Sequence, residues 1–393
     1  MKRLLLATAA GALCAGSVSA EDIKIGVLLG FTGPIESMAV HMGAGAEFAI
    51  KEVSDSGALL GGATVTPVRA DTTCVDAAAA TAAAERLITS DGVKAIVGAD
   101  CSGVTAAVLA NVAMPNGIVM ISPSATSPSL TDAPDNGLFF RTAPSDARQG
   151  QVMADVLMEE GVKSVAVTYT NNDYGKGLAD AFEAAYKAAG GTVTISASHE
   201  DGKADYSAEV GALASAGGDR LVVAGYADKG GGAIVQAAVD AGAFDMFHLP
   251  DGMVSNSTEE NLGQYLEGST GQVPGSDSPG TAKYVEIVGD AHDPTSTFSP
   301  ESYDAAALIM LAMQAAGSAE SSALKGKVMD VANAPGVKIY PGELAKGLKI
   351  LKDGGDIDYV GATSLELIGG GESAGNYRQI VIKDGKITTV KYR

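Results

Sequence analysis

Two apolar segments in the first half of the chain end in small hydroxyl side chains. The segments are KAIVGAD (94–100) and IVMISP (118–123), and the residues after them are Cys101, Ser102, Ser124, Ala125 and Thr126. Hydroxyl groups and the free N–H groups of a helix start can hold an anion such as a carboxylate. Each hydroxyl could equally be a helix N-cap, so a purely structural explanation stays open for each one.

Two tyrosines and one acid follow apolar segments in the second half. Tyr174 lies just beyond SVAVTYT, Tyr226 ends RLVVAGY, and Asp251 follows MFHLP. Tyrosine rings suit an apolar or cationic group, and a carboxylate suits an ammonium. Facing the hydroxyls of the first half across a cleft, these three side chains would complement an amino acid. Rim packing of the tyrosines and a turn at Asp251 are the structural alternatives.

The elements that would position these residues are short apolar strands alternating with Ala-rich helices. This alternation is typical of α/β proteins with parallel sheets. The pattern begins with a strand at 23–29 and a helix at 43–57, and it restarts with a helix at 145–161. It predicts two sets of about four βα units. The carboxyl ends of parallel strands meet at one sheet edge, where ligands bind, so the polar groups above are expected there.

The last third of the chain does not continue the alternation of strands and helices. A Gly/Ser/Pro-rich passage at 268–280 separates the βα units from a helical region that includes 302–317. The tail 377–392 predicts a β-hairpin that turns at Asp384-Gly385. A late helical region and a terminal hairpin can each join a different half, so we expect the chain to cross between halves more than once.

The first twenty residues have the pattern of a Sec-type signal peptide. Lys2 and Arg3 precede an apolar run that ends in Val18-Ser19-Ala20. Leu13 stands before Cys14, where a lipobox has a small residue, which argues against lipid attachment. We therefore expect export to the periplasm with cleavage after Ala20.

The mature chain is strongly acidic and long enough for two domains. Its formal net charge changes from −20 to −22 when Lys2 and Arg3 are removed, because residues 1–20 contain no acid. Such a surface repels nucleic acid and anionic membranes, so no nucleic-acid partner is expected. A single core stops growing at about 250–300 residues, which favours two domains for the mature length.

Cys74 and Cys101 are the cysteines that remain after cleavage. In an exported protein, two cysteines first predict one disulfide, and a thiol nucleophile is the alternative. The four histidines are scattered and offer no metal-ligand spacing. The sequence contains no nucleophile elbow, P-loop or His-Glu-x-x-His motif, so no metal, cofactor or enzymatic activity is expected.

The segments taken together resemble a known family. IKIGVLLGFTGP, IVGADCSG, SPSATSPSLT, NDYGKGLADAF and VVAGY occur in the order found in type I periplasmic binding proteins. The resemblance is strongest to the leucine/isoleucine/valine-binding group of ABC-transporter substrate-binding proteins, and it covers nearly the whole mature chain. It implies two Rossmann-like lobes joined by a three-segment hinge. Lobe 1 would comprise 21–143 and 275–370, and lobe 2 would comprise 144–274 and 371–393.

The resemblance also implies roles for individual residues. Ser102 and Thr126 would hold a ligand carboxylate, with Ala125 beside Thr126. The backbone carbonyl of Ser124 and the carboxylate of Asp251 would hold an ammonium. The remaining implied positions are Tyr174, Tyr226 and Tyr303 around the ligand side chain, Asp146 near the ligand at the first crossover, and a Cys74–Cys101 disulfide that fixes the loop carrying Ser102.

The implied function is capture of a small aliphatic or branched-chain amino acid by hinge closure. The partner would be an inner-membrane ABC permease, and the protein would be a monomer. Three departures touch the choice of ligand: Met38 where some relatives have an aromatic residue, Asp251 where some have glutamate, and the glycine-rich ADKGGG at 227–232. An amide, urea or aromatic acid stays open as the ligand. A sensor for a membrane receptor and a secreted hydrolase are the alternative functions.

Overall fold

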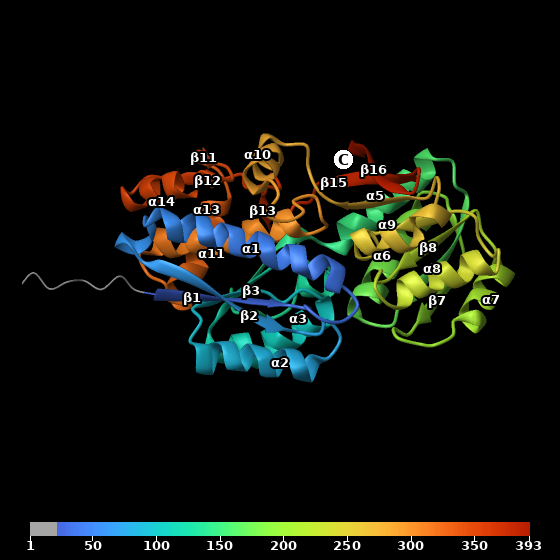
Figure 1. Cartoon of the computed structure of the whole chain (residues 1–393), viewed down its shortest axis with the longest axis horizontal. Coiled ribbons are helices and arrows are strands. Elements are labelled where there is room, and N and C mark those ends of the chain that lie inside the picture. The colour runs from blue at the N-terminus through green and yellow to red at the C-terminus, as the bar shows by residue number, and fades with distance from the viewer. Residues whose placement is uncertain (1–21) are drawn as a thin grey trace, which may run out of the picture.

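Two seven-stranded sheets organise the computed structural model, which describes residues 22–393. They form two lobes that lie side by side (Figure 1). The sheet of lobe 1 contains β1 (Asp22–Leu29), β2 (Thr64–Asp71), β3 (Ala95–Gly98), β4 (Val119–Ser122), β5 (Phe139–Pro144), β13 (Leu367–Ile368) and β14 (Glu372–Ser373). The sheet of lobe 2 contains β6 (Ser164–Thr170), β7 (Thr192–His199), β8 (Arg220–Ala224), β9 (Phe247–Leu249), β10 (Thr270–Pro274), β15 (Tyr377–Lys383) and β16 (Lys386–Tyr392).

The two sheets share one strand order. In lobe 1 the parallel strands run β2-β1-β3-β4-β5, and in lobe 2 they run β7-β6-β8-β9-β10. The predicted α/β fold with two parallel-sheet lobes is therefore confirmed. In this order the connections reverse direction between β1 and β3 and between β6 and β8, which is where ligands bind in open parallel sheets.

Helices cover both faces of each sheet (Figure 1). Those of lobe 2 are α5 (Asp146–Glu159), α6 (Asp173–Ala188), α7 (Ser207–Ala216), α8 (Gly230–Asp240) and α9 (Asn256–Leu262). Those of lobe 1 are α1 (Glu36–Ser56), α2 (Ala77–Arg86), α3 (Ser102–Val108), α4 (Met114–Asn116), α10 (Pro279–Val288), α11 (Ser299–Ala316), α12 (Ser321–Leu324), α13 (Val328–Ala332) and α14 (Leu344–Lys352). A small parallel pair, β11 (Val337–Ile339) and β12 (Ile357–Tyr359), lies beside α14. Among residues 22–393, no helix combines the length and the apolar character needed to span a bilayer.

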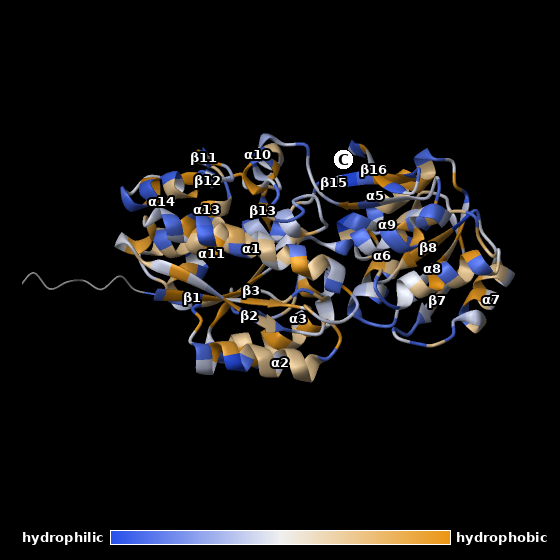
Figure 2. Ribbon diagram, in the orientation of Figure 1, coloured by the Kyte–Doolittle hydropathy of each residue, from blue (hydrophilic) through white to orange (hydrophobic). Residues whose placement is uncertain are grey.

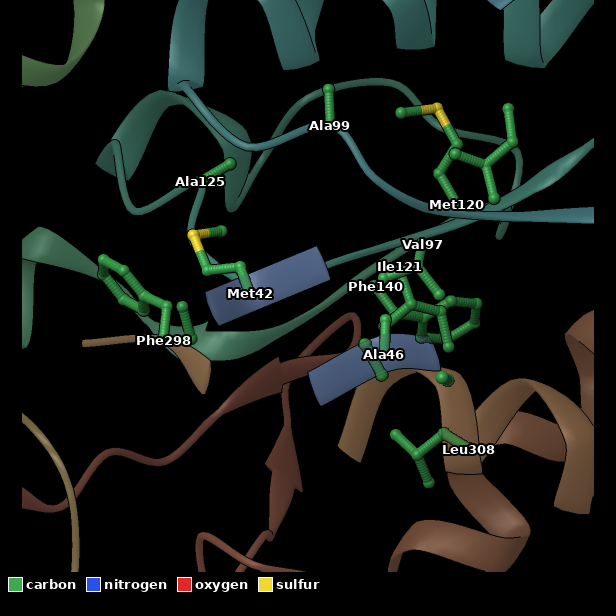
Figure 3. Packing of buried hydrophobic residues seen from close by; sticks show 14 of the residues in the cluster. Met42, Ala46, Val97, Ala99, Met120, Ile121, Ala125, Phe140, Phe298 and Leu308 are labelled. Atoms are coloured by element: carbon green, nitrogen blue, oxygen red, sulfur yellow. The ribbon is translucent and has the colours of Figure 1, made fainter. Parts of the chain in front are cut away.

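The core of lobe 1 is built from small and branched apolar side chains. The central strands of lobe 1 are among the most apolar parts of the ribbon (Figure 2), and all four residues of β3 are buried. α11 is buried along nearly its whole length because its Ala-rich sequence lets α1 and the sheet approach closely. Figure 3 shows this packing from close by, with Ala46 of α1 and Leu308 of α11 beside Phe140 of β5.

The chain crosses between the two sheets three times. The first crossing lies between β5 and β6, the second after β10, and the third between β14 and β15. The Gly/Ser/Pro-rich passage 268–280 is more than a separator, because it contains β10. β14 falls within the segment 371–393 that the sequence assigned to lobe 2, yet it pairs with β5 of lobe 1. We propose lobe boundaries at 143/144, at 274/275 and between β14 and β15.

The C-terminal hairpin agrees with its sequence-based prediction, and the first helix is longer than predicted. The terminal hairpin is confirmed, and its turn places Asp384 and Gly385 at φ 51° and 73°. The helix predicted at 43–57 instead begins at Glu36, so its first two turns were missed. The reason is that the residue preceding the helix, Ile35, makes no side-chain capping bond. The usual start signal is therefore absent from the local sequence.

The first turn of α11 buries an acid that predicts a pH effect on stability. Glu301 is 2% exposed, one of its carboxyl oxygens has no hydrogen-bond partner, and burial raises its pKa to about 8. Asp304 raises this pKa further, while Arg378 lowers it. Because the folded carboxyl holds its proton up to about pH 8 and the unfolded one loses it near 4.5, stability falls as pH rises between these values.

Glu301→Gln is expected to remove this dependence. The variant should gain stability over the wild type as pH rises from 5 to 8, by about 1.4 kcal/mol per pH unit. Urea unfolding at each pH measures the difference, in which all other titrating groups cancel. The exposed Glu286→Gln serves as the matched control. Parallel curves for Glu301→Gln and wild type would contradict the assignment.

Candidate functional site

A cavity lies between the lobes, where the carboxyl ends of both sheets meet, and the empty space there, part of it open solvent, is about 330 Å³. Lobe 1 lines it from the loops after β1, β3 and β4 and from α1, and lobe 2 lines it from the residues after β6, β8 and β9. The lining residues are Ile35, Met38, Met42, Asp100, Cys101, Ser102, Ser124, Tyr174, Tyr226, Asp251, Gly252 and Phe298.

The lobe 1 side of the cavity presents hydroxyls at the start of α3. Ser102 is the first residue of this helix, and its Oγ accepts a hydrogen bond from Ser127 N–H at 3.1 Å. The predicted Cys74–Cys101 disulfide is present and joins the loops after β2 and β3. It holds the start of α3 in place from the residue preceding Ser102.

A buried arginine shapes the segment 124–131, which carries the second set of hydroxyls. Arg141 of β5 is 1% exposed, and its Nη1 donates to the carbonyls of Ala125 at 3.0 Å and Ser127 at 2.9 Å. Its Nη2 donates to Thr131 Oγ1 at 2.8 Å and pairs with Glu372 at 2.5 Å. Three bonds from one planar group to the segment fix its path, and the ion pair with Glu372 holds that group in place.

The lobe 2 side of the cavity combines two aromatic rings with a carboxylate. The hydroxyl of Tyr174 donates to Asp251 Oδ1 at 2.5 Å, and Gly252 N–H donates to the same oxygen at 2.8 Å. The ring of Tyr174 stacks on that of Tyr226, with centroids 5.1 Å apart. The stack forms a rigid wall, and Asp251 is held at its edge.

Gln149 of α5 links Asp251 to a second buried acid. We orient its amide so that the nitrogen donates to Asp146 Oδ1 at 2.8 Å and the oxygen accepts from Asp251 N–H at 3.2 Å. Asp146 begins α5, and its N–H donates to the carbonyl of Thr126 at 2.8 Å. The Thr126 hydroxyl and Asp146 Oδ2 are buried without a hydrogen-bond partner. A polar network thus runs from lobe 1 through the first crossover to lobe 2.

The electrostatics of the site favour a cation. Burial raises the pKa of Asp100, Asp146 and Asp251, and the charge of Asp251 raises that of Asp146 further. Within residues 22–393, no lysine, arginine or histidine lines the cavity. Buried carboxylates without a facing cation are unfavourable, so an ammonium placed against Asp251 would be stabilised and would lower its pKa.

The remaining wall is apolar and comes from lobe 1. Ile35 precedes α1, Met38 and Met42 lie on its first two turns, and Phe298 precedes α11. Figure 3 shows Met42 between Ala125 and Phe298. Methionine side chains are flexible and fill irregular space, so this wall suits an aliphatic group. Of these four residues only Met38 was predicted to affect the choice of ligand, because the start of α1 has no capping signal in its own sequence.

Most of the predicted site residues come together. Ser102, Ser124, Tyr174, Tyr226 and Asp251 line the cavity. Three further predicted residues, Ala125, Thr126 and Asp146, are buried and do not line it. Thr126 and Asp146 belong to the polar network described above.

Tyr303 lies away from the site and does not line it. Its hydroxyl donates to Glu52 of α1 at 2.5 Å, and its ring packs 5.1 Å from that of Tyr284. The physical reason is the position of α11. Phe298, which precedes the helix, reaches the cavity, while Tyr303 points toward α1 inside lobe 1. Arg141 and Gln149 were missed as functional residues, although a lone polar residue in an apolar strand or helix face is the signal that could have found them.

Comparison with known proteins places this geometry in a family. The family model described as "Periplasmic binding protein" matches residues 22–351. The Leu/Ile/Val-binding protein homolog 3 of Brucella melitensis is 32% identical over 336 residues, covering 84% of this chain and 89% of its own.

Solved structures share the fold. The leucine-binding protein of Thermotoga maritima has a TM-score of 0.79 at 22% identity, covering 94% of this chain and 98% of its own. A solute-binding protein of R. palustris in complex with benzoate has a TM-score of 0.76 at 19% identity, covering 94% and 96%. With the two matching lobes and the cavity between their strand ends, the family match shows that this chain belongs to the periplasmic binding proteins.

Proposed function

We propose that this protein captures a small aliphatic amino acid for an ABC importer by closing its two lobes on it. The observation that carries the proposal is the division of polar groups in the cavity. Lobe 1 contributes hydroxyls, a helix start and the Asp100 carboxylate, which already accepts from Gly30 N–H and Thr72 Oγ1. Lobe 2 contributes the Asp251 carboxylate, and four apolar side chains complete the wall. The Brucella relative, whose name states binding of leucine, isoleucine and valine, supports the same ligand class.

Each group has a role in this proposal. Ser102 holds the ligand carboxylate from the cavity lining, and Thr126, which lies behind the lining, reaches it when the ligand is bound. The Ser124 carbonyl and Asp251 hold the ammonium. Tyr174 and Tyr226 pack against the ligand as a rigid stack. Asp146 acts behind them, through Gln149 and Thr126. These roles give the buried Thr126 hydroxyl, which has no partner within the described residues, a function in the liganded protein.

The alternative ligand is an aromatic acid. The R. palustris protein binds benzoate on the same fold, so the fold alone does not select the ligand. Here the selection comes from Asp100 and Asp251, which both line the cavity. An acid without an ammonium would place its charge beside buried carboxylates, with no facing cation among the described lining residues, and this is unfavourable. The site therefore favours a zwitterion.

The partner, the location and the absence of catalysis belong to the same proposal. A monomer delivers its ligand to an inner-membrane permease, without catalysis, a cofactor or a metal. The signal peptide expected at 1–20 lies outside the described residues. A sensor for a membrane receptor would have the same two lobes. A pull-down with the ligand-loaded protein decides between the two functions: recovery of a permease supports transport, and recovery of a receptor supports sensing.

A thermal-shift screen of the ligand-stripped mature protein tests the ligand class. The panel contains aliphatic and other amino acids, amides, urea and aromatic acids. An extrinsic dye is needed because the chain has no tryptophan. A ligand at one hundred times its Kd adds about 2.7 kcal/mol, which shifts the midpoint by several degrees. A shift with leucine, isoleucine or valine supports the proposal, and a shift confined to aromatic acids contradicts it.

Thr126→Ala is expected to weaken amino-acid binding at least tenfold. The change removes a hydrogen bond to a charged carboxylate, which contributes about 1.5–3 kcal/mol. Isothermal calorimetry with L-leucine measures the effect. Ser129→Ala, an exposed hydroxyl in the same segment, is the matched control and should bind as the wild type does. Equal affinities for all three proteins would remove Thr126 from the site.

A further inference from the structure

A carboxylate of lobe 2 reaches across the cleft and contacts the first turn of α1 in lobe 1. Asp228 Oδ2 accepts from Ser37 N–H at 2.8 Å, and Asp228 Oδ1 accepts from Ser37 Oγ at 2.9 Å. The two residues are 191 positions apart. The N-terminal end of α1 lies toward lobe 2 in the overall view (Figure 1).

This contact supplies what the helix lacks in its own sequence. Ile35, at the N-cap position of α1, makes no side-chain capping bond. The first N–H groups of a helix need acceptors, and the positive end of the helix dipole favours a negative charge. Asp228 meets both needs from the other lobe. We call the Ser37–Asp228 contact the cross-lobe cap.

Lobe 2 holds Asp228 firmly in this position. The loop from Tyr226 to Lys229 is tied back by Ala227 N–H, which donates to the carbonyl of Gly252 at 2.9 Å. The hydroxyl of Ser257, at the start of α9, donates to Asp228. The glycines noted at 230–232 have a purpose here, because a Cβ on Gly232 would stand 2.2 Å from the carbonyl oxygen of Ala227. Only glycine lets α8 start this close beneath the loop.

The cross-lobe cap adjoins the cavity wall on both sides. Ser37 directly precedes Met38, and Asp228 follows Tyr226 by two residues, while neither Ser37 nor Asp228 lines the cavity. Opening the lobes separates Ser37 from Asp228 and leaves the start of α1 without its acceptor. The cost of losing the cap is therefore added to the cost of releasing a ligand.

We infer that Asp228 is a positioning residue that caps α1 only in the closed protein and thereby slows ligand release. This inference rests on the proposed function for the identity of the ligand, but not for the contact itself. It assigns Asp228 an effect on the dissociation rate without any contact to the ligand.

The first test uses release kinetics with L-leucine. Asp228→Ala should raise the dissociation rate about tenfold, because two hydrogen bonds to a charged group are lost, with little change in the association rate. Asp228→Asn keeps an acceptor but loses the charge, so its effect should be smaller. Ser37→Ala should have an effect in the wild type and none in the Asp228→Ala background. Asp240→Ala, which removes an acid from the far end of α8, is the control.

The second test needs no ligand. Ser37→Cys/Asp228→Cys is treated with a short bifunctional thiol reagent, and Ser37→Cys/Asp240→Cys serves as the matched pair. An intramolecular crosslink in the first pair alone supports the juxtaposition, and equal yields overturn it. If the crosslink forms but no amino acid binds, the proposed function fails and the cross-lobe cap stands. If L-leucine binds and Asp228→Ala releases it at the wild-type rate, the role in release is overturned and the proposed function stands.

Discussion

Asp251→Asn is expected to weaken binding of an aliphatic amino acid at least a hundredfold. The carboxylate is 1% exposed, so an ammonium beside it is paired out of contact with water. Removing one partner of such a pair costs about 3–5 kcal/mol, and each 1.4 kcal/mol is about tenfold in affinity. The asparagine oxygen can still accept from Tyr174 and Gly252, so the fold should persist. Calorimetry with L-leucine measures the loss.

A ligand without an ammonium makes the test specific to charge. For 4-methylpentanoate, the leucine skeleton without its amine, Asp251→Asn should bind as well as the wild type or better, because a like charge has been removed from the cavity. Tyr174→Phe, which removes only the hydroxyl beside Asp251, should weaken L-leucine binding less than Asp251→Asn does. An Asp251→Asn protein that binds L-leucine as tightly as the wild type would rule out Asp251 as the ammonium partner.

Arg141→Met is expected to lower the free energy of unfolding by about 3–5 kcal/mol. The change leaves the buried carbonyls of Ala125 and Ser127 without donors and Glu372 without its cation. Affinity for L-leucine should fall with stability, because segment 124–131 loses its support. Urea unfolding measures the first effect and calorimetry the second.

Two variants separate the roles of Arg141. Arg141→Lys keeps the charge but not the planar fork, so it should still be clearly destabilised. Glu372→Gln should cost less, because Glu372 is partly exposed. If Arg141→Met unfolds at the wild-type urea concentration, the three bonds from Arg141 to the segment do not stabilise the fold.

The strands and the residues just beyond them could be predicted from the sequence. βα units produce regular alternation, and parallel strands bring their carboxyl ends to one edge, so Ser102, Ser124, Tyr174, Tyr226 and Asp251 could be named before the structure was known. The predicted positions depend on local pattern and on one rule of sheet geometry.

The features that could not be predicted share a physical cause: they depend on contacts with residues far away along the chain. The start of α1 was not visible because its acceptor, Asp228, lies 191 residues away. Arg141 and Gln149 gain their roles from partners on other elements. Tyr303 was placed in the site because the family resemblance implied it, but the orientation of α11 directs its ring into lobe 1. A sequence indicates which residues belong to a helix or strand more reliably than it indicates the direction in which the side chains of that element point.

The two halves of the cavity lining have a consequence for selection. The hydroxyls and the helix start suited to an anion belong to lobe 1, whereas Asp251, the acid proposed to pair with the ammonium, belongs to lobe 2. The Asp100 carboxylate of lobe 1 already accepts hydrogen bonds from Gly30 N–H and Thr72 Oγ1. A molecule with one of the two charges can satisfy one lobe while the other stays open. Only a molecule that carries both, at the right separation, joins the lobes. Under the proposed function, the protein closes fully only on a small molecule that carries both charges. The permease, by binding the closed form, then receives only such molecules.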